Sequence, residues 1–233
     1  MTERVTNLTQ PRVTFCGDSA LLLEAEGALS LETQQGIWNL SEEARGWPDV
    51  IDVQPGMNNL LVTLDPVRAE VEAYAERLLA AWLRIPRSRG LGRLIEIAVA
   101  YGGPGGQDLG DVASHHALSP QEIAALHAAP EYVVFAPGTG TGFGYLFGLD
   151  PRLFTPRRKV PVQRPVGGTV LLGGAQSNLG TKQRPGGPAM TTTGWYAIGQ
   201  ASDLPTPFDL ACDPPNLLTL GDRIRFRVDR VEA

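Results

Sequence analysis

The spacing of apolar residues predicts two amphipathic helices in the first part of the chain. Between residues 67 and 82 the apolar positions recur every three or four residues, with glutamate and arginine between them. This is the period of a helix with one buried face. A second apolar stripe runs from residue 31 to 44, where Ser30 can cap its start and Gly46 and Pro48 stop it.

Short runs of apolar and β-branched residues around these helices predict strands. They lie at residues 12–24, 50–53, 60–64 and 94–100. The first run is interrupted by Gly17-Asp18, which we interpret as a turn within one strand. The resulting order is that of a ferredoxin-like βαββαβ domain, in which two helices cover one face of an antiparallel sheet.

Beyond Tyr101 glycine and proline become frequent, and the helical pattern gives way to short strands. One helix is predicted up to His127, because Ser119 is followed by proline and glutamate at the offsets of a capping box. The later apolar runs are separated by glycine, proline and arginine, as in a β-barrel with long loops. We therefore predict an α+β protein with a ferredoxin-like domain at residues 1–92 and a β-barrel domain at residues 93–233.

Composition and charge narrow the function classes. The formal net charge of -5 gives no overall attraction to nucleic acid or to an anionic membrane. No stretch has the roughly twenty apolar residues of a membrane span, and the polar start lacks the apolar run of a secretory signal. Cys16 and Cys212 lie far apart and fit no metal-ligand spacing. We expect a cytoplasmic protein with no nucleic-acid partner, no membrane partner and no metal site.

Two features could act in binding or catalysis, and each has a structural alternative. The glycine-rich segment from Gly138 to Gly144 lacks the register of a dinucleotide loop and the lysine of a P-loop, so it is either a turn or a backbone that faces a ligand. His127 is suited to proton transfer near neutral pH, but at a helix C-terminus it can also be an imidazolium that stabilises the helix dipole.

The basic run at Arg157, Arg158 and Lys159 is a third candidate site. Arginine binds carboxylate and phosphate oxygens in a two-pronged fashion, so these side chains suit an anionic substrate. The alternative is a rim of solvated charge. The chain has no GxSxG elbow and no credible Ser-His-Asp set, so covalent nucleophilic catalysis has little support.

A series of motifs occurs in the order and spacing of one known family. They are FCGDSALLLEAEG from Phe15, VIDVQPGMNNLLVTLDP from Val50, YGGPGGQDL from Tyr101, LSPQEIAALHAAPEY from Leu118, GYLFGLDPRLFTPRRKVP from Gly144, VGGTVLLGGAQSN from Val166, RPGGP from Arg184, GWYAIG from Gly194 and LLTLGDRIRF from Leu217. With these motifs the chain resembles the B subunit of the ATP-dependent bacterial 5-oxoprolinase. That family is also labelled allophanate hydrolase subunit 1 and is related to a sporulation-kinase inhibitor.

The resemblance implies a fold, a reaction and partners. It implies an N-terminal ferredoxin-like domain and a C-terminal cyclophilin-like barrel. It also implies a homologous C-type subunit as partner, with which the chain looks like a split carboxyltransferase domain of urea carboxylase. In the family reaction 5-oxoproline is activated by ATP-dependent phosphorylation, and an A-type subunit takes part in ring opening to glutamate. ATP with Mg is the implied cofactor, held by this chain or with its partner.

Residues that match the family pattern become candidates for the site. His127, Arg157 and Arg158 are the catalytic candidates. Candidates for substrate binding are Gly142, Phe143, Tyr145, Gln176, Gly186, Gly187 and Trp195.

The chain also departs from the family pattern in two segments near these candidates. Thr139, Thr141 and Gly144 replace an aromatic residue and two prolines, and the stretch from Pro188 to Thr193 is inserted before Trp195. These departures leave open a changed substrate, a regulatory module that inhibits a histidine kinase, or a carboxyltransferase-type subunit for urea or allophanate.

Overall fold

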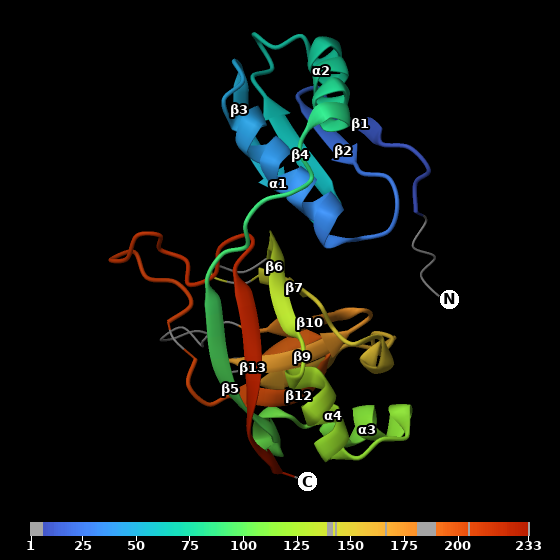
Figure 1. The fold of residues 1–233 in the computed structure, drawn as a ribbon, viewed down its shortest axis with the longest axis vertical. Coiled ribbons are helices and arrows are strands. Elements are labelled where there is room, and N and C mark those ends of the chain that lie inside the picture. The colour runs from blue at the N-terminus through green and yellow to red at the C-terminus, as the bar shows by residue number, and fades with distance from the viewer. Residues whose placement is uncertain are drawn as a thin grey trace. The chain divides into compact units, whose positions relative to one another are not determined.

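The computed structural model describes residues 7–138, 142, 144–165, 167–180, 190–204 and 206–232. The chain forms two compact units, residues 1–90 and residues 91–233 (Figure 1). Each unit has its own apolar core, one around Ile37 and Trp82 and the other around Tyr132 and Phe226. The mixed α+β class that the sequence predicts is confirmed.

The first unit is a four-stranded antiparallel sheet packed against two helices (Figure 1). Its elements are β1 Arg12–Cys16, β2 Ala20–Glu24, α1 Leu31–Arg45, β3 Val50–Pro55, β4 Asn59–Leu64 and α2 Val71–Arg84. The strand order is β1-β2-β4-β3. Leu21, Leu23, Leu60 and Val62 alternate with more exposed positions and are fully or almost fully buried, because the helices cover that face of the sheet.

Two details of the predicted βαββαβ order are corrected by the structure. The run at 12–24 is a hairpin rather than one strand, because Gly17 adopts a φ of 71° and the chain reverses there. The strand at 94–100 does not join this sheet. Instead, β1 pairs with β2 and takes the edge position that the last strand of a ferredoxin-like unit would fill.

The second unit is a closed barrel with the strand order β10-β7-β6-β13-β5-β12-β9. The barrel strands are β5 Leu94–Gly102, β6 Glu131–Pro137, β7 Gly144–Phe147, β9 Thr169–Gly173, β10 Gln176–Leu179, β12 Tyr196–Ala201 and β13 Arg223–Glu232. Since β5 pairs with both β12 and β13, the predicted strand at 94–100 is part of the barrel core. The closed barrel is compatible with the cyclophilin-like fold that the resemblance implies.

Helices and a separate ribbon complete this unit (Figure 1). They are the short helix η1 Gly103–Gly105, α3 Leu109–His116, α4 Pro120–Ala128, the short helix η2 Pro151–Leu153, and the ribbon of β8 Val162–Pro165 with β11 Met190–Thr193. The predicted capping box is confirmed, since Ser119 and Glu122 bond each other's backbone at the start of α4. The described part of the inserted stretch before Trp195 forms β11. None of the described helices is long and apolar enough to cross a membrane.

Candidate active site

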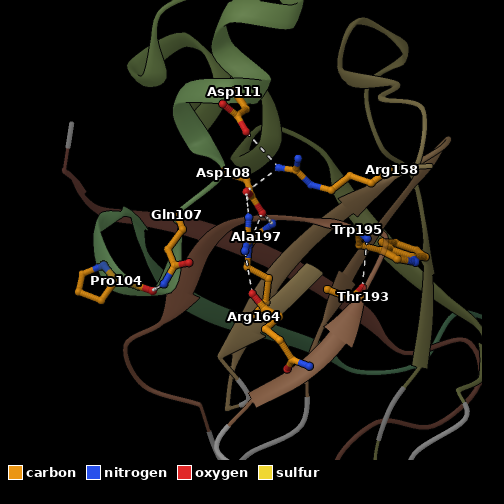
Figure 2. Close-up of polar contacts among 10 residues, drawn as sticks. Pro104, Gln107, Asp108, Asp111, Arg158, Arg164, Thr193, Trp195 and Ala197 are labelled. Carbon is orange, nitrogen blue, oxygen red and sulfur yellow. Dashed lines mark hydrogen bonds and ion pairs between the residues drawn. The ribbon is translucent and has the colours of Figure 1, made fainter. Parts of the chain in front are cut away.

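Asp108, directly before α3, ties together four separate parts of the second unit (Figure 2). Its side chain is 1% exposed and accepts hydrogen bonds from Arg158 Nη2 at 2.6 Å, from Arg164 Nε at 2.7 Å and from the backbone N–H of Ala197 at 2.8 Å. Arg164 Nη2 makes a further, very close contact with the same carboxylate. Helix α3, the segment before β8, β8 itself and β12 are therefore held by one buried carboxylate.

Burial and pairing act on the pKa of Asp108 in opposite directions. Burial disfavours the charged form, but the hydrogen bonds from Arg164 and Ala197 and the charges of Arg164 and Arg158 outweigh it, so the pKa lies below its usual range. The hydrogen bond to Asp108 likewise raises the pKa of Arg164. The cluster is therefore an ionised carboxylate with two guanidinium groups at neutral pH.

Arg158 is committed to partners within the chain. Besides Asp108, its Nη2 lies 3.0 Å from Asp111 Oδ2, and its guanidinium lies 4.2 Å from the centre of the Tyr196 ring. Its backbone N–H donates to the carbonyl of Gly194 at 2.8 Å. These contacts order the segment around Arg158, although its buried Nε has no described hydrogen-bond partner.

Arg157 differs from its neighbour. Its guanidinium lies 4.8 Å from the centre of the Trp195 ring, and none of the described carboxylates pairs with it. Trp195 is in turn packed against Gly173, where an added Cβ would lie only 2.7 Å from the ring. The exposed guanidinium of Arg157 is therefore stacked on an aromatic ring that is itself packed against the barrel.

Two of the predicted binding residues lie on the outer face of the barrel. Tyr145 pairs with Asn178, two residues after Gln176. Gln176 pairs with Gly173, and the register of β9 with β12 brings Trp195 opposite Gly173. Because successive side chains of a strand alternate, Tyr145 and Gln176 are on the face opposite to Leu146 and Ser177, which are buried inside the barrel, and the Trp195 ring lies against Gly173 of β9.

Gly142 is a structural requirement of its loop. It has a φ of 77°, and an added Cβ would lie 2.5 Å from the carbonyl oxygen of Pro207. Of the other predicted binding residues, Phe143, Gly186 and Gly187 lie outside the described residues. The sites assigned to them stay predictions.

His127 lies inside the barrel, away from the outer face. It is completely buried, and its Nδ1 and Nε2 are each 2.7 Å from a hydroxyl, of Tyr101 and of Ser177 respectively. Burial lowers its pKa to about 3, so the ring is neutral and the predicted imidazolium at the helix end is wrong. Through Ser177 the ring fixes β10, the strand that carries Gln176. Direct catalysis by His127 stays a prediction.

The buried ring predicts a specific dependence of stability on pH. The unfolded chain takes up a proton on His127 near pH 6.5, whereas the folded chain does so only near pH 3. Between these values the unfolded state binds more protons, so stability falls as the pH falls, by up to about 1.4 kcal/mol per pH unit from this group. In His127→Gln this contribution is absent, and urea midpoints measured from pH 7 to pH 4.5 should fall less steeply.

Equal slopes in His127→Gln and in the unmodified chain would show that His127 does not titrate as its burial requires.

Sequence reasoning did not single out Asp108 or Arg164. Asp108 is the acidic residue of YGGPGGQDL, which served as a family motif and not as a source of a functional side chain. The sequence did offer one signal for Asp108, since it is an acidic residue that follows several glycines and directly precedes a helix. The pairing with Arg164, 56 residues later, could not be read from spacing.

The comparisons with known proteins agree with this fold. The family model described as carboxyltransferase domain, subdomain C and D matches residues 11–218. A protein from Escherichia coli O157:H7, named as the B subunit of 5-oxoprolinase, is 38% identical over 94% of this chain and 96% of its own length. A protein of the same name from Haemophilus influenzae is 35% identical over 92% of this chain and 96% of its own length.

Two solved structures contain a similar unit within a longer chain. TTHA0988 has a TM-score of 0.70 and 30% identity, covering 92% of this chain but only 40% of that chain. Kluyveromyces lactis urea carboxylase has a TM-score of 0.73 at 17% identity, covering 95% of this chain and 22% of its own, and at that identity it shows the fold alone. The family model and the near full-length relatives establish that this chain belongs to the 5-oxoprolinase B subunit family of carboxyltransferase-domain proteins.

Proposed function

We propose that this chain is the B-type subunit of an ATP-dependent 5-oxoprolinase, acting with a C-type subunit as partner and with an A-type subunit. In that reaction the ring C–N bond of 5-oxoproline breaks, water supplies the oxygen of the new carboxylate, and ATP is converted to ADP and phosphate. The observation that carries the proposal is the 38% identity to a protein named as the 5-oxoprolinase B subunit over almost the whole of both chains.

Arg157, Trp195 and Gln176 supply groups that suit this substrate. 5-Oxoproline has one carboxylate and one lactam amide. Arg157 has no described carboxylate partner and can bind the substrate carboxylate with two hydrogen bonds, while the Trp195 ring keeps the guanidinium in place. Gln176 carries an amide that can both donate to and accept from a lactam. The contribution of this chain is then orientation of the substrate rather than a covalent step.

The described residues do not by themselves form a site for ATP with Mg. Among them no group of three histidine, cysteine or acidic side chains could hold a metal ion. Mg²⁺ in nucleotide sites is usually held by one or two carboxylates with phosphate oxygens. The two acidic side chains that pair with Arg158, those of Asp108 and Asp111, are therefore already taken by arginine. We assign ATP with its Mg to the side that the partner completes, and derive no step from it.

Reconstitution tests the proposal directly. The chain, its C-type partner and an A-type subunit are mixed with ATP and 5-oxoproline, and glutamate and ADP are measured. Equal release of both products is expected, with none when this chain is left out. An assembled complex without turnover contradicts the proposal. Inhibition of a histidine kinase without ATP turnover, or activity that needs a biotin carrier, would instead support one of the two other functions.

A further inference from the structure

The two edges of the sheet in the first unit are built differently. At β3 the backbone N–H of Val53 donates to the carboxylate of Asp52, and the carbonyl of Val53 accepts from Arg45. A register shift after Val50 and a proline at position 55 also interrupt this edge. Bulges, charges and proline are the devices by which proteins prevent a further strand from pairing. The β3 edge is therefore protected.

The β1 edge is less protected. Pro11 and Arg12 lie at its start, but from Val13 to Cys16 it carries neither a charge nor a proline, and among the described strands it pairs only with β2. Among the described side chains, the Cys16 thiol alone approaches its backbone, at 4.0 Å from the carbonyl of Thr14. An unprotected strand edge with β-branched and aromatic residues is a template for strand addition.

Phe15 is on the core face of this strand but is not covered. It pairs with Leu21, and Val13 pairs with Leu23, so Val13 and Phe15 share the face on which Leu21 and Leu23 are completely buried. Phe15 is nevertheless 50% exposed. Phe15 lines an open pocket together with residues at the start of helix α2, so the ring is only partly covered.

A groove lies between the β1–β2 turn and the start of α2. It encloses about 410 Å³ and is lined by Phe15, Gly17, Asp18, Pro66, Ala69, Glu70, Val71 and Glu72. Asp18, Glu70 and Glu72 are exposed, and none of them forms an ion pair with a described residue. The groove thus has an aromatic side chain, a free strand edge beside it and three carboxylates around it.

We propose that β1 and this groove, defined by Phe15, Asp18, Glu70 and Glu72, dock an extended segment of the C-type partner. The segment adds to the β1 edge as a further strand, covers Phe15 with an apolar side chain, and presents lysine or arginine to the three carboxylates. The three carboxylates favour a basic partner segment over a second copy of this chain. Pairing of two copies through β1 would bring the same acidic groups together, which disfavours self-association. The inference rests on the proposed function, since it assigns a role to the partner named there.

Substitutions at the groove test the inference without touching the barrel. Phe15→Ala removes the aromatic contact and should raise the dissociation constant for the C-type partner at least tenfold. Glu70→Lys combined with Glu72→Lys should raise it similarly, slow association and abolish its dependence on salt. Glu70 makes no capping hydrogen bond, but Glu72 lies in the first turn of α2, so circular dichroism checks that the double variant keeps the helix. Isothermal titration calorimetry and stopped-flow mixing give the two readouts.

Matched controls sit on the same unit. Ile51→Ala removes a side chain that is 64% exposed on the protected β3 edge, and Glu76→Lys reverses a charge on α2 outside the groove. Both should bind like the unmodified chain. Groove variants that also bind within twofold of the unmodified chain would overturn the inference and leave the proposed function standing. Failure of the unmodified chain to bind the partner would refute both.

A photo-crosslinking amino acid at position 15 distinguishes the occupants. A crosslink to the C-type partner in the assembled complex is expected. A crosslink to a second copy of this chain would overturn the inference in favour of self-association, and a crosslink to neither would overturn it outright.

Discussion

Replacing Asp108 with alanine is expected to lower the free energy of unfolding of the barrel unit by about 3 kcal/mol or more. The change leaves Arg158 and Arg164, whose side chains are 21% and 16% exposed, without their shared carboxylate. It also leaves the N–H of Ala197 without an acceptor. Removing one partner of a buried ion pair typically costs about 3–5 kcal/mol, because the remaining charge stays buried and unpaired. Urea unfolding followed by hydrogen exchange measures the loss separately in each unit.

Two further variants make the measurement specific. Asp111→Asn alters a carboxylate that is 66% exposed and pairs with the same arginine, so it should change stability by no more than about 0.5 kcal/mol. Asp108→Asn keeps the volume and one acceptor oxygen, and its effect should fall between the two. If Asp108→Ala unfolds at the same urea concentration as the unmodified chain, the carboxylate does not hold these segments together.

The same carboxylate sets an acid limit on stability. The pKa of Asp108 is lower in the folded chain than in the unfolded one, so its contribution is complete above the ordinary aspartate pKa. It is lost only as the pH falls through the lowered folded value. His127 acts over a higher range of pH, so the two groups can be separated in one titration.

Much of the fold follows from local patterns, and the errors in predicting it come from long-range pairing. The two helices of the first unit and the capping box of α4 are confirmed because period and capping are properties of neighbouring residues. The strand at 94–100 was correctly identified as a strand but placed in the wrong sheet. Its neighbours β12 and β13 lie about a hundred or more residues away, and apolar alternation does not show with which strand a strand pairs.

The residues of the candidate site could be predicted from the sequence, but their contacts with distant segments could not. Resemblance and residue type pointed to Arg157, Trp195 and Gln176; in the structure Arg157 stacks on Trp195, and Trp195 lies against Gly173, the strand partner of Gln176. The same reasoning treated Arg157 and Arg158 as equivalent. Only the structure separates a guanidinium held by Asp108 from one that has no described carboxylate partner, because the difference depends on contacts between distant segments.

Because Arg157 has no described carboxylate partner, we expect its substitution to weaken substrate binding in the assembled complex. Arg157→Ala removes the guanidinium that we assign to the substrate carboxylate and should raise KM for 5-oxoproline by about 10- to 100-fold, the value of a charge-assisted two-pronged hydrogen bond. If the carboxylate does not change during ring opening, ground state and transition state lose the same binding energy, so kcat should stay within a few-fold. Steady-state release of glutamate measures both constants.

Variants of neighbouring residues show whether charge or geometry matters. Arg157→Lys keeps the charge but loses the planar fork and its stacking on Trp195, so its KM should lie between the two extremes. Lys159→Ala removes an exposed positive charge two residues away and should leave KM unchanged. A loss of kcat with unchanged KM in Arg157→Ala would mean that the guanidinium acts on the reacting amide instead. Equal KM values in Arg157→Ala and Lys159→Ala would reduce Arg157 to one of several solvated charges, because a bound carboxylate cannot lose its two-pronged donor without losing affinity.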